Sequence, residues 1–246
     1  MKGNFKLGKI NDVIYVYSNA KAFEYTYTGI SFSEFIEFLR EPIQNIVILN
    51  GNYMGDSFRK NFEIFVGKDS IEKLSNEVEY GEFSFVDCLN ESAVETLSNE
   101  EIAEILYLGH MKYPLNSPFF YTLKNRFVYL SNDNSFYCKV YCKLKKDVGD
   151  VIEGKIKKSI YKILGVKVKN LSKEIKKKLI NSFEKGILID FQELKYYKKN
   201  VIINIYCIGK YKDMDQVLNN KDKYKCLKNL DLQLMYSRDE WSVVFK

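Results

Sequence analysis

The chain has 246 residues, of which 46% are hydrophobic and 15% aromatic, and it carries a formal net charge of +6. This composition excludes a disordered chain, because disordered segments are poor in aromatic and β-branched residues. The length fits one large domain or two small ones. The chain has only three prolines and no linker-like run, so we expect two lobes that pack against each other.

A membrane-spanning helix needs roughly 20 mostly apolar residues. The longest stretch without a charge runs only from Pro42 to Gly55 and is interrupted by Asn, Gln and Gly. The N-terminus lacks the apolar core and the cleavage site of a signal peptide. The five cysteines are an odd number and are typical of reduced core thiols in a cytosolic chain. We therefore expect a soluble, cytoplasmic protein.

Charge is distributed unevenly along the chain. Residues 1–130 hold 12 basic and 18 acidic side chains, whereas residues 131–246 hold 26 and 14. The excess is strongest over residues 131–185, with 15 lysines and 6 acids. Such asymmetry indicates an acidic or polyanionic partner. Two observations weaken this interpretation. An A/T-rich coding sequence also yields many lysines, and arginine, whose planar fork suits phosphate, occurs only four times.

The first predicted elements are a hairpin and a helix. Residues 13–17 and 22–27 alternate as two strands around a short turn. Ser31 followed by Glu34 forms a capping box, which predicts a helix that ends before Pro42. A buried strand is expected over residues 45–49.

The middle of the chain contains one ambiguous stretch and several clear elements. Residues 58–75 are helical in part, and residues 78–88 alternate as a half-buried strand does. A second capping box at Ser98 opens a helix over residues 99–109. Two β-rich runs around a polar turn predict a hairpin over residues 125–143.

The last part of the chain begins with two amphipathic helices. The apolar stripe of the first consists of Ile156, Ile160, Ile163 and Leu164, and that of the second, over residues 171–185, consists of Leu171, Ile175, Leu179 and Phe183. Lysines surround the apolar stripe of each helix. The remaining predicted elements are strands at 187–197, 201–208, 232–236 and 241–245 and a short helix near 213–219.

Hairpins dominate this pattern and βαβ alternation is weak. The sequence therefore predicts an α+β fold with mainly antiparallel sheets and several amphipathic helices. We place a mixed α+β lobe over residues 1–145 and a basic lobe of helices and β-hairpins over residues 146–246.

The segment from Gly149 to Ile156 approximates a phosphate-binding loop, because two glycines at the required spacing precede Lys155. The loop requires Ser or Thr to bind Mg²⁺ at the position that Ile156 occupies, and an acidic residue within it opposes phosphate. We therefore interpret the segment as a strand-to-helix turn and expect no cofactor.

A metal site is not expected. His110 is the only histidine, which excludes a site with several histidines. Cys138 and Cys142 lie on the same face of a predicted strand. Their spacing is wider than that of zinc-binding pairs, and zinc needs four ligands.

The weak catalytic candidates are Cys88 and His110, which could form a nucleophile–base pair oriented by an acid such as Asp87 or Asp133. Nothing in the sequence brings them together. A single histidine behind a helix is more often a capping or packed residue.

The basic region has three interpretations. Its lysines form the solvated faces of two helices, a docking surface for an acidic protein, or a binding surface for nucleic acid or anionic membrane. Tyrosines next to lysines at 196–199 resemble a base-stacking site, although no recognised nucleic-acid-binding signature is present. The candidate binding residues are Lys157, Lys158, Lys162, Lys173, Lys177, Tyr196, Tyr197 and Lys198.

One segment carries a resemblance. It reads ILYLGHMK at residues 105–112, PL at 114–115, SPF at 117–119 and NRFVYL at 125–130. It resembles an uncharacterised family of soluble proteins from low-G/C Gram-positive bacteria whose members often carry the label "oxalate:formate antiporter". That label does not fit a chain without membrane helices. Relatives continue with a His-Asp-Asp-Gly-Trp turn, whereas residues 131–136 here read SNDNSF and retain one acid.

The resemblance implies no activity. Physically, the segment predicts a helix end that crosses through a proline-constrained loop into a hairpin. We expect His110, Pro114, Pro118 and Arg126 to form a structural hub, with Arg126 bonding free carbonyls between helix and sheet.

The sequence thus favours a non-enzymatic, cytoplasmic interaction or regulatory protein that binds a protein partner. The alternative is a nucleic-acid-associated protein that binds through the lysine-rich region 150–185, and the third is a hydrolase that uses His110.

Overall fold

The computed structural model describes residues 13–49, 62–77, 83–131, 137–211, 216–217 and 230–245. Within these residues the chain forms twelve strands and six α-helices, and the strands pair antiparallel, which confirms the α+β class. The chain divides into two compact units. Unit 1 comprises Met1–Lys21, Tyr25–Ile30 and Val148–Lys246, and unit 2 comprises Ala22–Glu24 and Ser31–Asp147.

The units differ from the two predicted lobes at the N-terminus. The sequence placed the opening hairpin in the first lobe, but β1 (Val13–Asn19) pairs with β8 (Ile187–Asp190) in unit 1, with Val13 opposite Asp190. All four residues Val13–Val16 are fully buried. A pairing between such distant segments leaves no trace in the local pattern from which the lobes were predicted.

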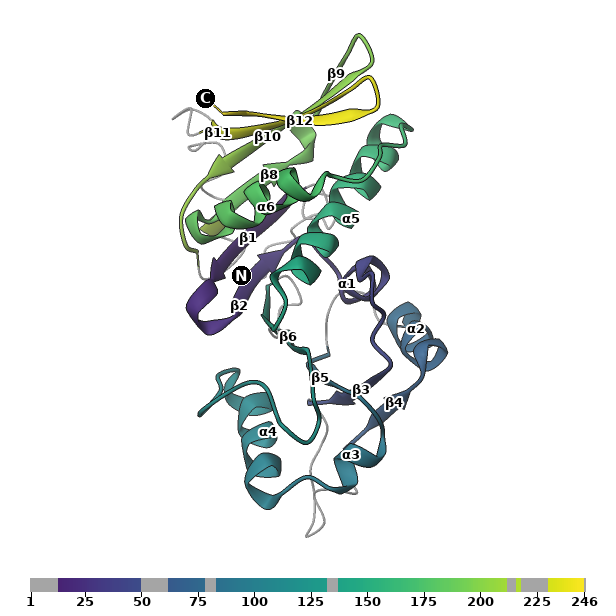
Figure 1. The fold of residues 1–246 in the computed structure, drawn as a ribbon, viewed down its shortest axis with the longest axis vertical. Coiled ribbons are helices and arrows are strands. Elements are labelled where there is room, and N and C mark those ends of the chain that lie inside the picture. The colour runs from purple at the N-terminus through teal and green to yellow at the C-terminus, as the bar shows by residue number, and fades with distance from the viewer. Residues whose placement is uncertain are drawn as a thin grey trace, which may run out of the picture. The chain divides into compact units, whose positions relative to one another are not determined.

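The strands of unit 1 lie in the order β12–β11–β10–β8–β1–β2, and β9 also pairs with β10 (Figure 1). Their remaining bounds are β2 (Glu24–Thr28), β9 (Lys195–Tyr197), β10 (Asn200–Cys207), β11 (Leu230–Ser237) and β12 (Glu240–Phe245). The strand predicted over 187–197 is interrupted, because the Asp190 carboxylate accepts a 3.0 Å hydrogen bond from the Gln192 backbone N–H. This bond caps a 3-10 turn, η5 (Phe191–Glu193).

Unit 1 also contains α6 (Lys173–Ser182) and, from Val148 on, α5 (Lys145–Leu164). The predicted apolar stripe of α6 is confirmed, since its members are buried. The stripe of α5 is confirmed only in part, because Ile163 is 44% exposed. The buried apolar residues of α5 begin about two turns before Ile156, the first residue of the predicted stripe, and they are Val148, Val151, Ile152, Ile156 and Ile160.

The strands of unit 2 lie in the order β7–β6–β5–β3–β4. Their bounds are β3 (Asn45–Ile48), β4 (Ile64–Val66), β5 (Phe85–Cys88), β6 (Phe127–Ser131) and β7 (Cys138–Cys142). The helices are α1 (Phe32–Phe38), α2 (Lys68–Glu77), α3 (Ser92–Glu95) and α4 (Asn99–Met111). The described part of the ambiguous stretch 58–75 therefore holds a strand followed by a helix.

The sheet of unit 2 has an apolar layer on each face. Phe85 stands opposite Tyr129, their rings stack with centroids 5.2 Å apart, and Phe32 and Phe35 of α1 pack onto them edge-on or tilted. Successive strand residues point to opposite faces, so Val86 joins a second core with α4. That second core includes Val47, Val128, Tyr141, Ile105 and Leu108.

Both predicted capping boxes are confirmed. The Ser31 hydroxyl accepts a hydrogen bond from the Glu34 backbone N–H, and the Glu34 carboxylate accepts one from the Ser31 N–H. Ser98 and Glu101 do the same for α4. In the part of the chain that the structure describes, no helix has both the length and the apolarity of a membrane span.

Candidate functional site

The charge asymmetry follows the two units. Unit 1 carries 26 basic and 13 acidic side chains, a net charge of +13, whereas unit 2 carries 12 and 19, a net charge of −7. The division is sharper than the one between the two halves of the sequence, because the N-terminal lysines belong to unit 1. A candidate site for an acidic partner therefore lies in unit 1.

Two hairpin tips lie at the same end of unit 1. β9 and β10 are joined by Lys198 and Lys199, and β11 and β12 by Arg238 and Asp239. Because β10 starts where β11 ends, with Val201 opposite Tyr236, the two tips are neighbours. Figure 1 shows the β11–β12 tip beside the C-terminal end of α5 and the β9–β10 tip next to the β11–β12 tip.

Both tips are tight two-residue turns with a left-handed backbone. φ is 49° and 66° at Lys198 and Lys199, and 51° and 66° at Arg238 and Asp239. Two consecutive positive φ angles in a two-residue hairpin are typical of a type I′ turn, which favours Asn-Gly. Charged L-residues hold these positions at a conformational cost, so the tips present charge where glycine would be more stable.

An aromatic row crosses the sheet next to the tips. Tyr196 stands opposite Val201, Val201 opposite Tyr236, and Tyr236 opposite Trp241. Opposed residues of an antiparallel sheet point to the same face, so the four side chains share one face. The rings of Tyr236 and Trp241 have centroids 5.1 Å apart, and Tyr196 at the end of the row is 49% exposed.

The loop after α5 is fastened to this row. The Lys169 backbone N–H donates to the Tyr236 hydroxyl at 3.3 Å, and the Trp241 indole N–H donates to the Lys169 carbonyl at 2.8 Å. The Lys169 ammonium lies 3.8 Å from the Asp239 carboxylate. These contacts hold the C-terminal end of α5 and its lysines beside the hairpin tips.

We call this surface the basic end of unit 1. It combines exposed tyrosines with lysines: Lys167 Nζ lies 6.0 Å from the Tyr161 ring centroid, and Lys198 Nζ lies 5.1 Å from that of Tyr197. Tyr161 is 54% and Tyr197 64% exposed. We define it by the basic and aromatic residues of the C-terminal part of α5, the loop after it, β9 and the two tips, among which Asp239 is also present: Lys157, Lys158, Tyr161, Lys162, Lys167, Lys169, Lys195, Tyr196, Tyr197, Lys198, Lys199 and Arg238.

The structure separates the predicted binding residues into two sets. Lys157, Lys158, Lys162 and the hairpin residues Tyr196, Tyr197 and Lys198 belong to the basic end. Lys173 and Lys177 are exposed on α6, which turns back along the first half of α5. They therefore lie away from the tips.

The sequence did not single out Tyr161, Lys167, Lys169 or Arg238. The signal that could have found Arg238 is the short polar connection between two strand-like runs at 232–236 and 241–245. The signal is weak because Arg-Asp is not among the dipeptides that usually occupy a type I′ turn.

The segment that resembles a phosphate-binding loop lies within α5. Asp150 and Glu153 are buried, and each accepts a 2.5 Å hydrogen bond from the buried Lys176 ammonium of α6. The Glu153 carboxylate also accepts a hydrogen bond from the Leu171 backbone N–H. The segment is thus neither a phosphate cradle nor the predicted strand-to-helix turn, because its acids bind a lysine of the next helix.

The weak catalytic candidates are not brought together. Cys88 is buried, and burial, with the charges of Asp87 and Glu91, raises the pKa of its thiol to about 12, which opposes thiolate formation. His110 is exposed in the last turn of α4 and makes no hydrogen bond with another described residue. Asp133 lies outside the described residues. The described residues also contain no group of three or more side chains suited to a metal ion.

Arg126 connects distant parts of unit 2. Its guanidinium donates to the Glu41 carboxylate at 3.0 Å and to the Glu41 carbonyl at 2.9 Å, just beyond α1. Its backbone N–H and that of Phe127 donate to one oxygen of the buried Asp87 at 2.9 and 2.5 Å. Arg126 thus bonds a carbonyl, as expected, but one that follows α1 rather than α4.

The other predicted hub residues have smaller roles, and Asn125 is the buried centre of the loop. Its side chain donates to the carbonyls of Pro118 and Phe127 and accepts from the Phe120 N–H at 2.7 Å. Pro114 is half-buried. His110, being exposed, takes no part in this network, because the end of α4 is fixed instead by the left-handed Lys112 and its bond to the Leu108 carbonyl.

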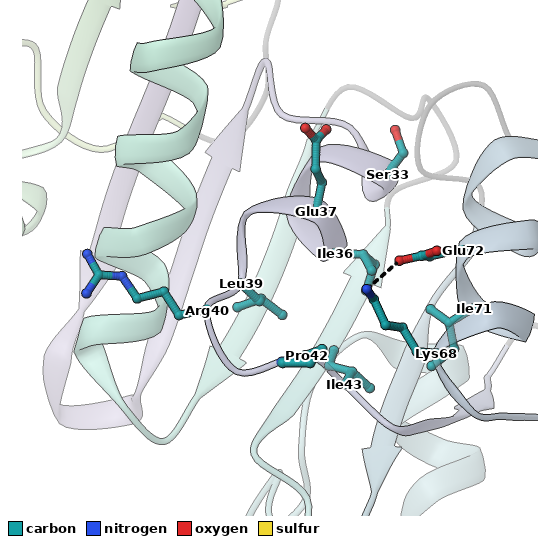
Figure 2. Close-up of a pocket in the computed structure, with 10 residues that line it drawn as sticks. All are labelled: Ser33, Ile36, Glu37, Leu39, Arg40, Pro42, Ile43, Lys68, Ile71 and Glu72. Atoms are coloured by element: carbon teal, nitrogen blue, oxygen red, sulfur yellow. Dashed lines mark ion pairs between the residues drawn. The ribbon is translucent and has the colours of Figure 1, made fainter. Parts of the chain in front are cut away.

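A pocket of about 560 Å³ lies between α1 and α2 in unit 2 (Figure 2). Ile36, Leu39 and Ile71 are its apolar lining residues, and Lys68 and Glu72, which also line it, form a 3.1 Å ion pair along α2. Among the described residues that line it, there is no group of three or more side chains suited to a metal ion. Comparisons of the chain with protein-family models, with curated proteins and with solved structures gave no match.

Proposed function

We propose that this protein is a non-enzymatic interaction protein that binds an acidic macromolecule through the basic end of unit 1. The observation that carries the proposal is the convergence of α5 lysines with two charged hairpin tips, held together by the contacts of Lys169. Lysines from separate segments reinforce one another's potential when the fold fixes them at one end.

The compartment is part of this proposal, and we take it to be the cytoplasm. Cys88, Cys138, Cys142 and Cys207 are free thiols, and the first three are buried. Free thiols in a core fit a reducing environment.

We also propose kinship with the uncharacterised soluble family from Gram-positive bacteria. It rests on the segment over residues 105–130, whose Asn125 and Arg126 organise the loop that follows α4. The kinship adds no activity to the proposal.

The test compares two charge reversals of equal size. Lys162→Glu/Lys198→Glu alters the basic end, and Lys173→Glu/Lys177→Glu alters the exposed face of α6 by the same change in charge. The salt concentration that elutes each folded variant from immobilised heparin, a generic polyanion, is measured. We expect the first pair to lower it well below the second. Equal shifts would mean that net charge alone governs binding, and the proposed site would be wrong.

A further inference from the structure

The two neighbouring tyrosines of β9 carry an inference that rests on the proposed function. Tyr196 and Tyr197 are 49% and 64% exposed and lie next to the tip formed by Lys198 and Lys199. We infer that the acidic partner of the basic end is a single-stranded nucleic acid whose bases stack on these two rings.

The rings are held in place by the hairpin. Lys195, Tyr196 and Tyr197 pair with Ile202, Val201 and Asn200, so the backbone of β9 is fixed up to the turn. The left-handed turn residues then leave little freedom at the tip. A ring that is already ordered loses little conformational entropy when a base stacks on it.

The side chains of β9 point alternately to opposite faces of the sheet, and this favours a single-stranded nucleic acid over an acidic protein as the partner. Consecutive strand residues point to opposite faces, so Tyr196 shares a face with Tyr236 and Trp241, whereas Tyr197 points to the other face. One flat protein surface would cover only one of the two rings. A flexible strand of nucleotides can pass around the tip and place a base on each ring, with its phosphates beside the lysines.

The residue types of the basic end favour single-stranded over double-stranded nucleic acid as the partner. Bases in a duplex are stacked on one another, so their faces are not open to tyrosine, and duplex reading favours the arginine fork. Within the basic end, Arg238 is the one arginine. Ring faces flanked by lysines are the arrangement that binds single strands without sequence preference. Tyr161 of α5, beside Lys167 of the loop that follows this helix, offers a third ring at the basic end.

The test measures binding of a labelled oligothymidylate by fluorescence anisotropy. Tyr196→Leu/Tyr197→Leu removes both rings but keeps apolar side chains and charge. We expect the dissociation constant to rise by roughly 5- to 150-fold for each ring that stacks a base. Tyr196→Phe/Tyr197→Phe should bind like the unaltered protein. Tyr121→Leu, which removes a tyrosine that is 88% exposed in unit 2, is the matched control and should change nothing.

Salt dependence distinguishes stacking from charge. The leucine variant should keep the slope of the logarithm of the binding constant against the logarithm of salt, whereas Lys162→Glu/Lys198→Glu should flatten it. Competition with polyglutamate and with a blunt DNA duplex completes the experiment. Both should compete poorly against the labelled single strand.

The outcomes separate this inference from the proposed function. If the leucine variant binds as tightly as the unaltered protein while the glutamate variant does not, the site stands and the stacking inference is wrong. Polyglutamate that competes equally well, charge for charge, would identify an acidic protein as the partner class. If none of these polyanions binds, both proposals are overturned.

Discussion

Unit 1 and unit 2 both bury acidic side chains, but they stabilise them by different means. In unit 1, the Lys176 ammonium lies 2.5 Å from both Asp150 and Glu153. In unit 2, Asp87 accepts two backbone N–H bonds, and the Arg126 guanidinium lies 3.9 Å from its second oxygen. One unit supplies a counter-ion from a neighbouring helix, and the other supplies mainly peptide dipoles from a neighbouring strand.

The difference has an electrostatic consequence. Burial raises the pKa of Asp87 to about 7, although the N–H bonds and the Arg126 charge act in the opposite direction. Dipoles of the backbone thus offset only part of the cost of removing a carboxylate from water. Asp150 and Glu153 have the Lys176 ammonium as their counter-charge, whereas Asp87, held mainly by backbone N–H groups, changes its charge near neutral pH.

The largest effect is expected when the counter-ion of unit 1 is removed. Lys176→Met leaves Asp150 and Glu153 buried without a positive charge and should lower the free energy of unfolding by about 3–5 kcal/mol. Denaturation in urea at pH 7 measures this loss in the free energy of unfolding. Lys178→Met is the control, because Lys178 pairs with Glu174 in an exposed position where water screens the interaction. Equal losses in both variants would contradict the role assigned to Lys176.

The next effect concerns the pH response of unit 2. The pKa of Asp87 lies above its ordinary value of 3.8, so the folded state retains a proton that the unfolded state loses between about pH 4 and 7. The free energy of unfolding therefore falls as pH rises through this window, by about 4 kcal/mol in total. Asp87→Asn removes the titrating group, and its stability relative to the unaltered protein should increase from pH 4 to pH 8. If the free energy of unfolding changed with pH in the same way for both proteins, the assignment of this pH dependence to Asp87 would be wrong.

A smaller effect is expected at two helix glycines, one in each unit. A Cβ at Gly109 would come within 2.8 Å of the Leu49 carbonyl oxygen. A Cβ at Gly149 would instead meet side chains, the Ile180 Cδ1 at 2.6 Å and Cγ1 at 3.1 Å and the Lys176 Cγ at 3.2 Å. Backbone cannot move aside as a methyl group can. Gly109→Ala should cost about 1–3 kcal/mol. Gly149→Ala should change stability by less than about 1 kcal/mol, because alanine's helix propensity offsets the contact. Thermal unfolding of both variants measures the two losses of stability. A larger loss for Gly149→Ala than for Gly109→Ala would contradict the prediction.

The smallest effect is expected at the hairpin tips of unit 1. Lys198→Asn/Lys199→Gly supplies the residues that a type I′ turn favours and should raise the free energy of unfolding by about 1 kcal/mol. The same variant should weaken retention on heparin, because it removes two charges from the basic end. A gain in stability with unchanged retention would show that the tip does not bind polyanions.

Local signals in the sequence predicted much of this fold. The two capping boxes place the starts of α1 and α4 because their bonds join residues only three apart. The apolar stripe of α6 is regular enough to give its buried face. The class of the fold followed from the hairpins, since each is recognisable from its own strands and turn.

Pairings between distant segments could not be predicted. The sequence gives no reason for Lys176 to meet Asp150, for Arg126 to meet Glu41, or for Val13 to lie opposite Asp190. The candidate site shows the same limit. Tyr196, Tyr197 and Lys198 were identified from their composition, but the second tip and the loop of Lys169 join them only through the register of β10 and β11.

The pairing of β1 with β8 affects how the chain is made. Unit 2 is inserted into the sequence of unit 1, and Ile187–Asp190 leave the ribosome long after Val13–Asn19. Synthesis proceeds from the N-terminus, so unit 2 can be complete while β1, which has β2 on one side, still lacks β8 on the other. During that interval the nascent chain exposes an apolar strand edge of the kind that pairs with other chains. The species most prone to aggregate is therefore a chain with a finished unit 2 and with the β8-facing edge of β1 still open.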